Sequence, residues 1–174
     1  MSRDTSASAA LFSNAWRTLT PGEIALCRSV FPGPVPYEEV RLIDGPRVND
    51  LAEAAFRNRN TAITLRRTIY FGMRWCCDFS QADAMGRRLF VHEMTHVWQW
   101  KRLGVIRFLA RYGRDLIACR GDAAAMYRYE QDDLPFAGSR LEAQAEMVGD
   151  YQLAALPHRS LIERKLAGSG LYGL

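Results

Sequence analysis

The chain is poor in the features that mark membrane, secreted and disulfide-rich proteins. It has no apolar run long enough for a transmembrane helix, and its first residues lack the basic-then-apolar order of a secretory signal. Its four cysteines fit neither a disulfide framework nor paired Cys-x-x-Cys metal sites, because two stand alone and Cys76 and Cys77 are adjacent. We therefore expect a cytoplasmic protein with reduced thiols and no membrane partner.

Clustered positive charge is also missing. The net charge of +4 comes mainly from arginines scattered along the chain, and no basic block is interleaved with aromatic residues. Nucleic-acid binding is therefore not indicated. The 174 residues, with 48% hydrophobic and 24% charged residues, suit one globular domain. We predict that residues 1–15 are disordered or loosely attached and that residues 16–174 form this domain; the oligomeric state is left open.

The first half of the chain predicts one helix and a small sheet. Thr20, followed by Pro21 and by Glu23 at the capping-box position, predicts a helix that ends before Pro32. Residues 40–43 predict a short strand. Residues 61–72 are rich in β-branched and aromatic side chains and predict either two short strands or one long bent strand.

Histidine is scarce as well, and its distribution is the most informative feature of the chain. Two of the three histidines lie in the pentapeptide His92-Glu93-Met94-Thr95-His96. Ser80 and Asp83 form a capping signature before this segment, apolar residues recur around it at helical spacing, and Gly104 follows it. The motif is therefore expected in the middle of a helix, with a second helix over residues 105–119.

Two histidines four residues apart share one face of a helix, so both imidazoles can bind one divalent ion. Glu93 would stand beside that ion, where it can take a proton from an attacking water. A catalytic zinc takes three protein ligands and keeps one position open. The alternative is a structural helix whose histidines pack in the core.

A helix predicted from Ser139 to about residue 156 offers the third ligand. Glu142, Glu146 and Asp150 recur every fourth residue and form an acidic stripe on one face. Like charges at this spacing repel one another, and a bound cation would remove the conflict. The alternative is that Glu142 completes a capping box with Ser139 and that the other two acids pair with surface arginines.

This pattern of a His-Glu-x-x-His helix followed by a helix with spaced acids resembles the gluzincin zinc metallopeptidases. The resemblance implies that Glu142 binds zinc and that Glu146 orients His92. Glu146 departs from the aspartate usual in the family. A second register, with Glu146 on the metal and Asp150 behind it, restores that aspartate. We favour Glu142.

The resemblance implies an α+β fold, a mainly helical zincin-like minimal domain with a small β-sheet before the motif helix. It implies a zinc-dependent peptidase in which Glu93 is the general base and an edge strand binds the peptide substrate. The whole chain also resembles short bacterial vgr-related proteins, which implies a secretion-system partner. The alternative function is thus a non-catalytic metal-binding or scaffold module of such an assembly.

Four further side chains are candidate donors to a transition state: His158, Tyr127, Tyr129 and Tyr151. A loop histidine exposed to solvent and tyrosines at the edge of the core are the competing interpretations.

Overall fold

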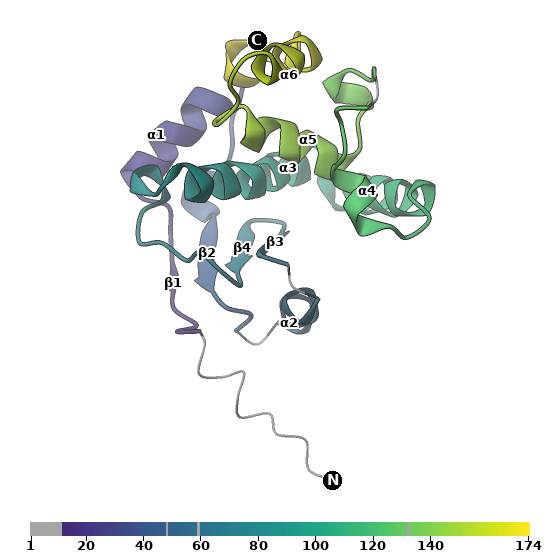
Figure 1. The fold of residues 1–174 in the computed structure, drawn as a ribbon. Helices are drawn as coiled ribbons and strands as arrows, with labels where there is room; N and C mark the ends of the chain where they lie inside the picture. Colours follow the sequence, from purple (N-terminus) through teal and green to yellow (C-terminus); the bar gives the residue numbers. More distant parts are fainter. Residues whose placement is uncertain (1–11, 48, 59, 132) are drawn as a thin grey trace.

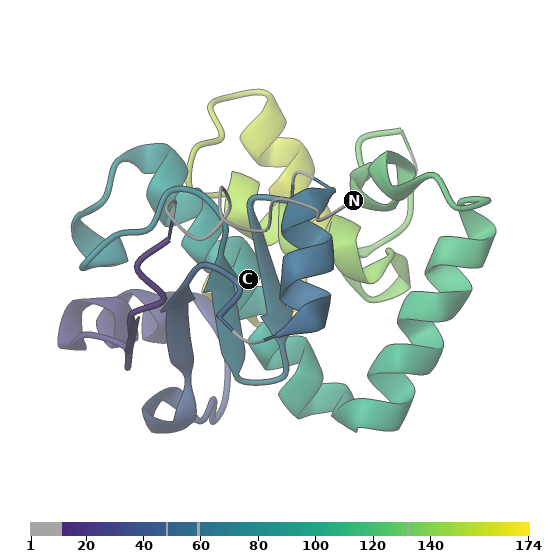
Figure 2. The ribbon, with the colours of Figure 1, turned by 90° about the horizontal axis from the view of Figure 1, so that it is seen from below.

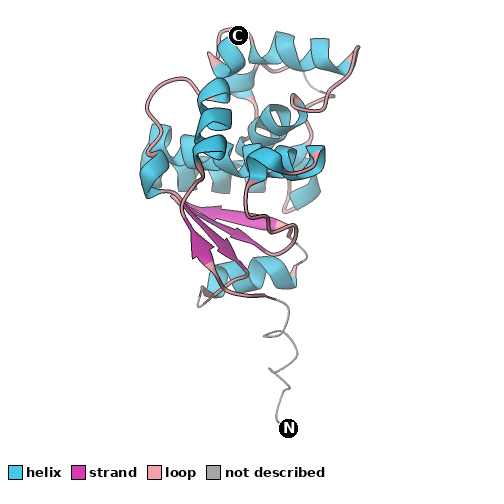
Figure 3. Ribbon diagram, turned by 90° about the vertical axis from the view of Figure 1, so that its left-hand side faces the viewer, coloured by secondary structure: helices cyan, strands magenta, loops and turns pink. Residues whose placement is uncertain are grey.

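The computed structural model describes residues 12–47, 49–58, 60–131 and 133–174, and these form a mixed α and β fold (Figure 1). The helices are α1 (Pro21–Val30), α2 (Asp50–Arg57), α3 (Ala84–Ala118), α4 (Ala123–Tyr127), α5 (Leu141–Asp150) and α6 (His158–Leu166). The strands are β1 (Trp16–Arg17), β2 (Arg41–Asp44), β3 (Ala62–Leu65) and β4 (Thr68–Phe71). Figure 3 shows the sheet between α2 and the larger helical layer that contains α3. The α+β prediction is confirmed.

The sheet places β3 at its edge. Among the described strands the order is β1-β2-β4-β3, with β2 and β4 parallel and the other two pairs antiparallel. The register sets Leu42 beside Ile69 and Ile69 beside Thr64, so these side chains share one face. All three are buried, and Thr64 reaches α3 from this face. The edge strand is thus held directly against the motif helix.

The strand predictions are confirmed. The strand expected at residues 40–43 is β2, displaced by one residue. The stretch 61–72 forms two short strands, β3 and β4, and the turn between them includes Arg66 at φ 61°. The N-terminal segment expected to be loosely attached lies largely outside the described residues. Its described end contacts the sheet, because the backbone N–H of Ser13 donates to Asp44 Oδ2 (2.9 Å).

The capping box predicted for the first helix is confirmed. Thr20 Oγ1 accepts a hydrogen bond from the backbone N–H of Glu23, and Glu23 Oε2 accepts one from the backbone N–H of Thr20. The glutamate does more than cap. It is completely buried, pairs with Arg17 at 2.7 Å, and accepts a hydrogen bond from the backbone N–H of Phe79. It therefore ties α1 to the segment that enters α3.

The long helix α3 begins three residues later than the predicted capping signature. Asp83, not Ser80, is the N-cap: its Oδ1 accepts a hydrogen bond from the backbone N–H of Gly86. Ser80 lies in a separate short turn that Asp78 caps. Gly104, at φ 73° and ψ 168°, interrupts the helix where the sequence predicts an end, and the second half leaves in a new direction (Figure 2). None of the helices in the described part of the chain is long and apolar enough to cross a membrane.

The helix expected from Ser139 is shorter and starts differently. Its N-cap is Arg140, which makes no side-chain cap bond, and α5 spans only ten residues. Ser139 Oγ donates to Pro135 O, so the capping box with Glu142 is not formed and this part of the alternative interpretation is wrong. The backbone N–H of Leu141 is instead satisfied by Asp115 Oδ2 from α3. Since Glu142 is not used for capping, its carboxylate is available to face α3.

Candidate metal centre

Helices α3 and α5 lie side by side, and a glycine permits their close approach at the motif (Figure 1). A Cβ atom built on Gly149 would lie 3.0 Å from Arg88 O and 3.3 Å from His92 Cβ. Such contacts are tighter than a side chain usually makes, so glycine lets the two backbones come this near. His92, Glu93 and His96 are all buried at this contact.

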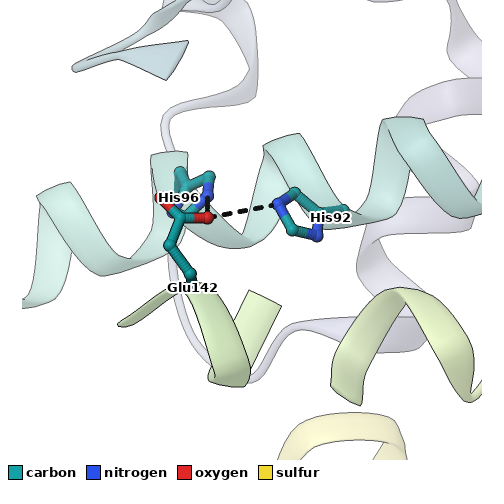
Figure 4. Close-up of side chains that lie close together, drawn as sticks. All are labelled: His92, His96 and Glu142. Carbon is teal, nitrogen blue, oxygen red and sulfur yellow. Dashed lines mark hydrogen bonds and ion pairs between the residues drawn. The ribbon is translucent and has the colours of Figure 1, made fainter. Parts of the chain in front are cut away.

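Glu142 of α5 lies between the two imidazoles (Figure 4). Its Oε2 is 3.1 Å from His96 Nε2 and 3.6 Å from His92 Nε2. Ligand atoms of the three residues all lie within 4.8 Å of one another. Two imidazole nitrogens and one carboxylate oxygen form a donor set that suits zinc, and the residues present therefore fit a catalytic zinc site.

The outer nitrogen of each imidazole has its own acceptor. His92 Nδ1 is 3.0 Å from Glu146 Oε2, and His96 Nδ1 is 2.9 Å from Gln99 Oε1. The side-chain amide of Gln99 is oriented through its nitrogen, because Nε2 donates hydrogen bonds to Leu141 O and to Gln144 Oε1. A carboxylate and an amide oxygen can only accept, so each Nδ1 carries the hydrogen. Without a metal ion, an Nε2 that donates to Glu142 is protonated too; loss of that second proton would free a lone pair on the side of the carboxylate, where a metal ion can bind.

The rest of the acidic stripe is held by an arginine. Arg88 pairs with Glu146, and its Nε lies 2.6 Å from Asp150 Oδ1. The other oxygen of Asp150 accepts a hydrogen bond from Tyr129 OH at 2.7 Å. The repulsion predicted along the stripe is therefore relieved by Arg88 and by His92. Glu142 lies with the imidazoles and Glu146 behind His92, while Asp150 contacts neither histidine, which is the arrangement of the first register.

Glu93 is fixed by the edge strand. Thr64 Oγ1 of β3 lies 2.7 Å from Glu93 Oε2 and donates a hydrogen bond to it. The same hydroxyl lies 3.3 Å from the backbone carbonyl of Glu93. The carboxylate is buried, and among the described residues it is not part of the group of candidate ligand atoms formed by His92, His96 and Glu142, which suits a base and not a ligand.

The electrostatics of the cluster favour a cation. Burial alone lowers the pKa of His92, but hydrogen bonds to Glu142 and Glu146 outweigh this and raise it to about 10. For Glu142, burial raises the pKa and the two histidines lower it well below the usual range. The carboxylates around the two imidazoles thus stabilise positive charge at this place, either as protons on the imidazoles or as a bound metal ion.

A cavity of about 220 Å³ opens beside the cluster. It is lined by the histidines, Glu93, Glu142 and the edge strand, and on the other side by the second half of α3. Tyr127 also lines it, with its ring 6.0 Å from that of His92, and burial raises the pKa of the phenol so that it remains a donor.

The other candidate donors lie elsewhere. Tyr129 OH is 2.8 Å from His158 Nε2 as well as bonded to Asp150, and Tyr151 OH donates to Glu163. None of these side chains lines the cavity beside the cluster. His158 is partly buried and paired with Tyr129, so the interpretation as an exposed loop histidine is also wrong.

Sequence reasoning missed the residues that orient the site. Thr64, Arg88 and Gln99 each contact a motif residue or its partner. Gln99 follows His96 by three positions and Arg88 precedes His92 by four, so helical spacing could have indicated both. Nothing local indicates Thr64, which is 29 residues from Glu93.

Comparison with known proteins finds that the chain is similar to proteins of secretion systems. Residues 35–104 match the model of the eCIS core domain. The chain is 32% identical over 143 residues to the type VI secretion system spike protein VgrG2b of Pseudomonas aeruginosa. This alignment covers 81% of the chain but only 13% of the length of VgrG2b. The solved effector domain of VgrG2b is similar in structure, with a TM-score of 0.63 and 30% identity, covering 93% of this chain and 90% of that domain.

Proposed function

Because the chain belongs to the vgr-related family of the VgrG2b effector domain, we propose that it is an effector-type domain of a secretion spike assembly whose metal centre hydrolyses peptide bonds. The comparisons support the association with a secretion system. The chemistry is argued from the site. One observation carries it: Glu142 from α5 joins the Nε2 atoms of His92 and His96, with Glu93 beside them.

His92, His96 and Glu142 would hold the zinc, and three ligands leave a position for water or substrate. Zinc in such a site acts as a Lewis acid that polarises a carbonyl and acidifies water. The chain contributes the orientation of its ligands. Glu146 and Gln99 fix the two imidazoles with Nε2 inward, so the site is arranged before any ion arrives.

Glu93 would act as the general base. Its carboxylate takes the proton of the attacking water and passes it to the leaving amine. The hydroxyl of Thr64 holds one oxygen in place, and Glu93 lines the same cavity as His92, His96 and Glu142. The same strand, β3, has an unpaired edge within the described sheet and lines the cavity, so an extended peptide can add to it as a further strand.

The test is Glu93→Gln. Glutamine has the same size and can still accept the hydrogen bond from Thr64, so the variant should fold and bind one zinc. Loss of the base should lower kcat/KM on a cleaved peptide by about 100-fold to 10,000-fold. His96→Ala is the matched variant that loses the metal, as measured by elemental analysis. Hydrolysis by Glu93→Gln at the parental rate would refute the mechanism.

The second candidate function is a non-catalytic metal-binding module of the same assembly. It is supported by the description of VgrG2b as a spike protein, since a domain of an assembly can be retained for binding. Zinc at full occupancy, without turnover of a broad peptide library by the parent protein, would select this candidate. Intact Glu93, which a scaffold does not need, favours the enzyme.

A further inference from the structure

A second cavity of about 210 Å³ lies away from the cavity beside the metal centre. Its walls come from both halves of α3, the turn before α5, α5 itself, and the end of α6 with the segment that follows it. Trp98, Phe136 and Pro135 provide apolar walls. Gln99 and Gln144 also line it, and Gln99 is bonded to His96 on its other side, so this cavity lies behind the metal centre.

The charged side chains in the lining of this cavity are all cationic: Arg102, Arg111 and Lys165. Within the described residues, neither arginine has a carboxylate oxygen within 4 Å. The guanidinium of Arg102 lies 5.1 Å over the ring of Trp98. Arg111 Nη2 donates to two backbone carbonyls, those of Ala137 (3.0 Å) and Ser139 (2.6 Å).

The arginine on the second half of α3 is incompletely satisfied. Arg111 Nε is buried and has no hydrogen-bond partner among the described residues. Burial lowers the pKa of this guanidinium and Asp115 only partly opposes it. Asp115 is itself engaged, with Arg114 and with the backbone N–H of Leu141. A half-buried cation that has no carboxylate in direct contact is costly, and an anion in the cavity would offset its charge.

We propose that this cavity binds a carboxylate carried on an apolar body, such as an aromatic organic acid or the C-terminus of a peptide. Guanidinium groups recognise carboxylates through paired N–H donors, and Arg102 and Arg111 supply two such groups. The aromatic walls accept the body of the ligand. The volume suits a small ligand, since it lies below the roughly 300–1,000 Å³ of sites for drug-sized molecules.

The test is calorimetric titration of the metal-free protein with N-acetyl-phenylalanine, its amide and inorganic phosphate. We expect saturable binding of the carboxylate and about tenfold weaker binding of the amide, because only the carboxylate makes charge-assisted hydrogen bonds. Arg102→Gln should weaken carboxylate binding about tenfold. Arg107→Gln removes the same charge from an exposed position on the same helix and should leave the affinity unchanged.

Arg102 is exposed and its guanidinium lies over the Trp98 ring, so its variant should fold, which a thermal melt checks. Equal weakening by the two variants would overturn the proposal, because general charge would then explain binding. The proposal would also be overturned if phosphate bound as tightly as the carboxylate, or if carboxylate binding did not saturate by about 10 mM ligand. Phenylacetate separates the sources: equal binding identifies a free acid, and weaker binding a peptide C-terminus. The titration needs no hydrolysis and is independent of the peptidase proposal.

Discussion

Removing the glutamates of α5 one at a time distinguishes the metal ligand from the residue that orients it. Glu146 lies 3.0 Å from His92 Nδ1 and is partly exposed, so Glu146→Ala removes a hydrogen-bond acceptor without opening a core cavity. Loss of such a partner lowers metal affinity by about 10-fold to 100-fold, or about 1.4–2.7 kcal/mol.

Glu142→Ala should cost more, because this carboxylate is buried between both Nε2 atoms. Loss of a direct ligand should lower zinc affinity by more than about 100-fold, beyond the range expected for a residue that only orients a ligand. Asp150→Ala is the matched control. It removes an acid one turn further along the same helix, bonded to Arg88 and Tyr129 but to neither histidine. Its zinc affinity should stay within about threefold of the parent.

The assay is zinc titration in competition with a chelator of known affinity, with elemental analysis for stoichiometry and circular dichroism to check folding. The expected order of loss is Glu142→Ala, then Glu146→Ala, then Asp150→Ala. If Glu146→Ala abolished binding while Glu142→Ala cost less than about 100-fold, the ligand would be Glu146 and the reasoning from Nε2 geometry would be refuted. Equal losses for Glu146→Ala and Asp150→Ala would show that only the charge of α5 matters.

Three further predictions concern pH and stability. In the metal-free protein the pKa of His92 is about 10, lowered by burial but raised more by the two glutamates of α5, against about 6.5 when unfolded. The protonated His92 thus contributes fully to the stability of the metal-free protein below pH 6.5, and this contribution is lost as the pH rises toward 10. Zinc affinity should increase over the same range, because zinc displaces the proton. As the pH rises, the melting temperature should therefore fall without zinc, and the increase in melting temperature that zinc produces should grow. Gly104→Ala should destabilise the fold by about 1–3 kcal/mol, because φ 73° with ψ 168° is a conformation that almost only glycine adopts. Gly113→Ala, inside the helix with open space around it, should be neutral or stabilising, and equal melting temperatures of the two variants would contradict this. Glu23→Ala should lower the free energy of unfolding in urea by about 3–5 kcal/mol, because the carboxylate is fully buried and paired with Arg17. Glu53→Ala, whose ion pair is exposed, should lower it by less than about 0.5 kcal/mol. Similar losses for the two variants would show that burial of Glu23 does not matter.

Sequence reasoning was most accurate where the signal is local. The capping box at Thr20, the two strands in residues 61–72 and the break at Gly104 depend on residues a few positions apart, and all three are confirmed. It was wrong about Ser80 and Ser139, which have the residue type of an N-cap. Their side chains were free to bond elsewhere, because Asp83 in one case and the distant Asp115 in the other satisfied the backbone instead.

The sequence by itself determined that two imidazoles and Glu93 share one helix, since a spacing of four residues fixes their common face whatever surrounds them. It also restricted the third candidate ligand to the acids of α5. Only the tertiary structure decided which of these acids faces the histidines, because a helix carrying acids at every fourth residue can present any of them depending on its shift along α3. Gly149 sets that shift by allowing contact at His92, and Arg88 holds the two remaining acids. The cationic cavity behind the metal centre has the same origin: its arginines are nine residues apart and are brought together only by the bend at Gly104.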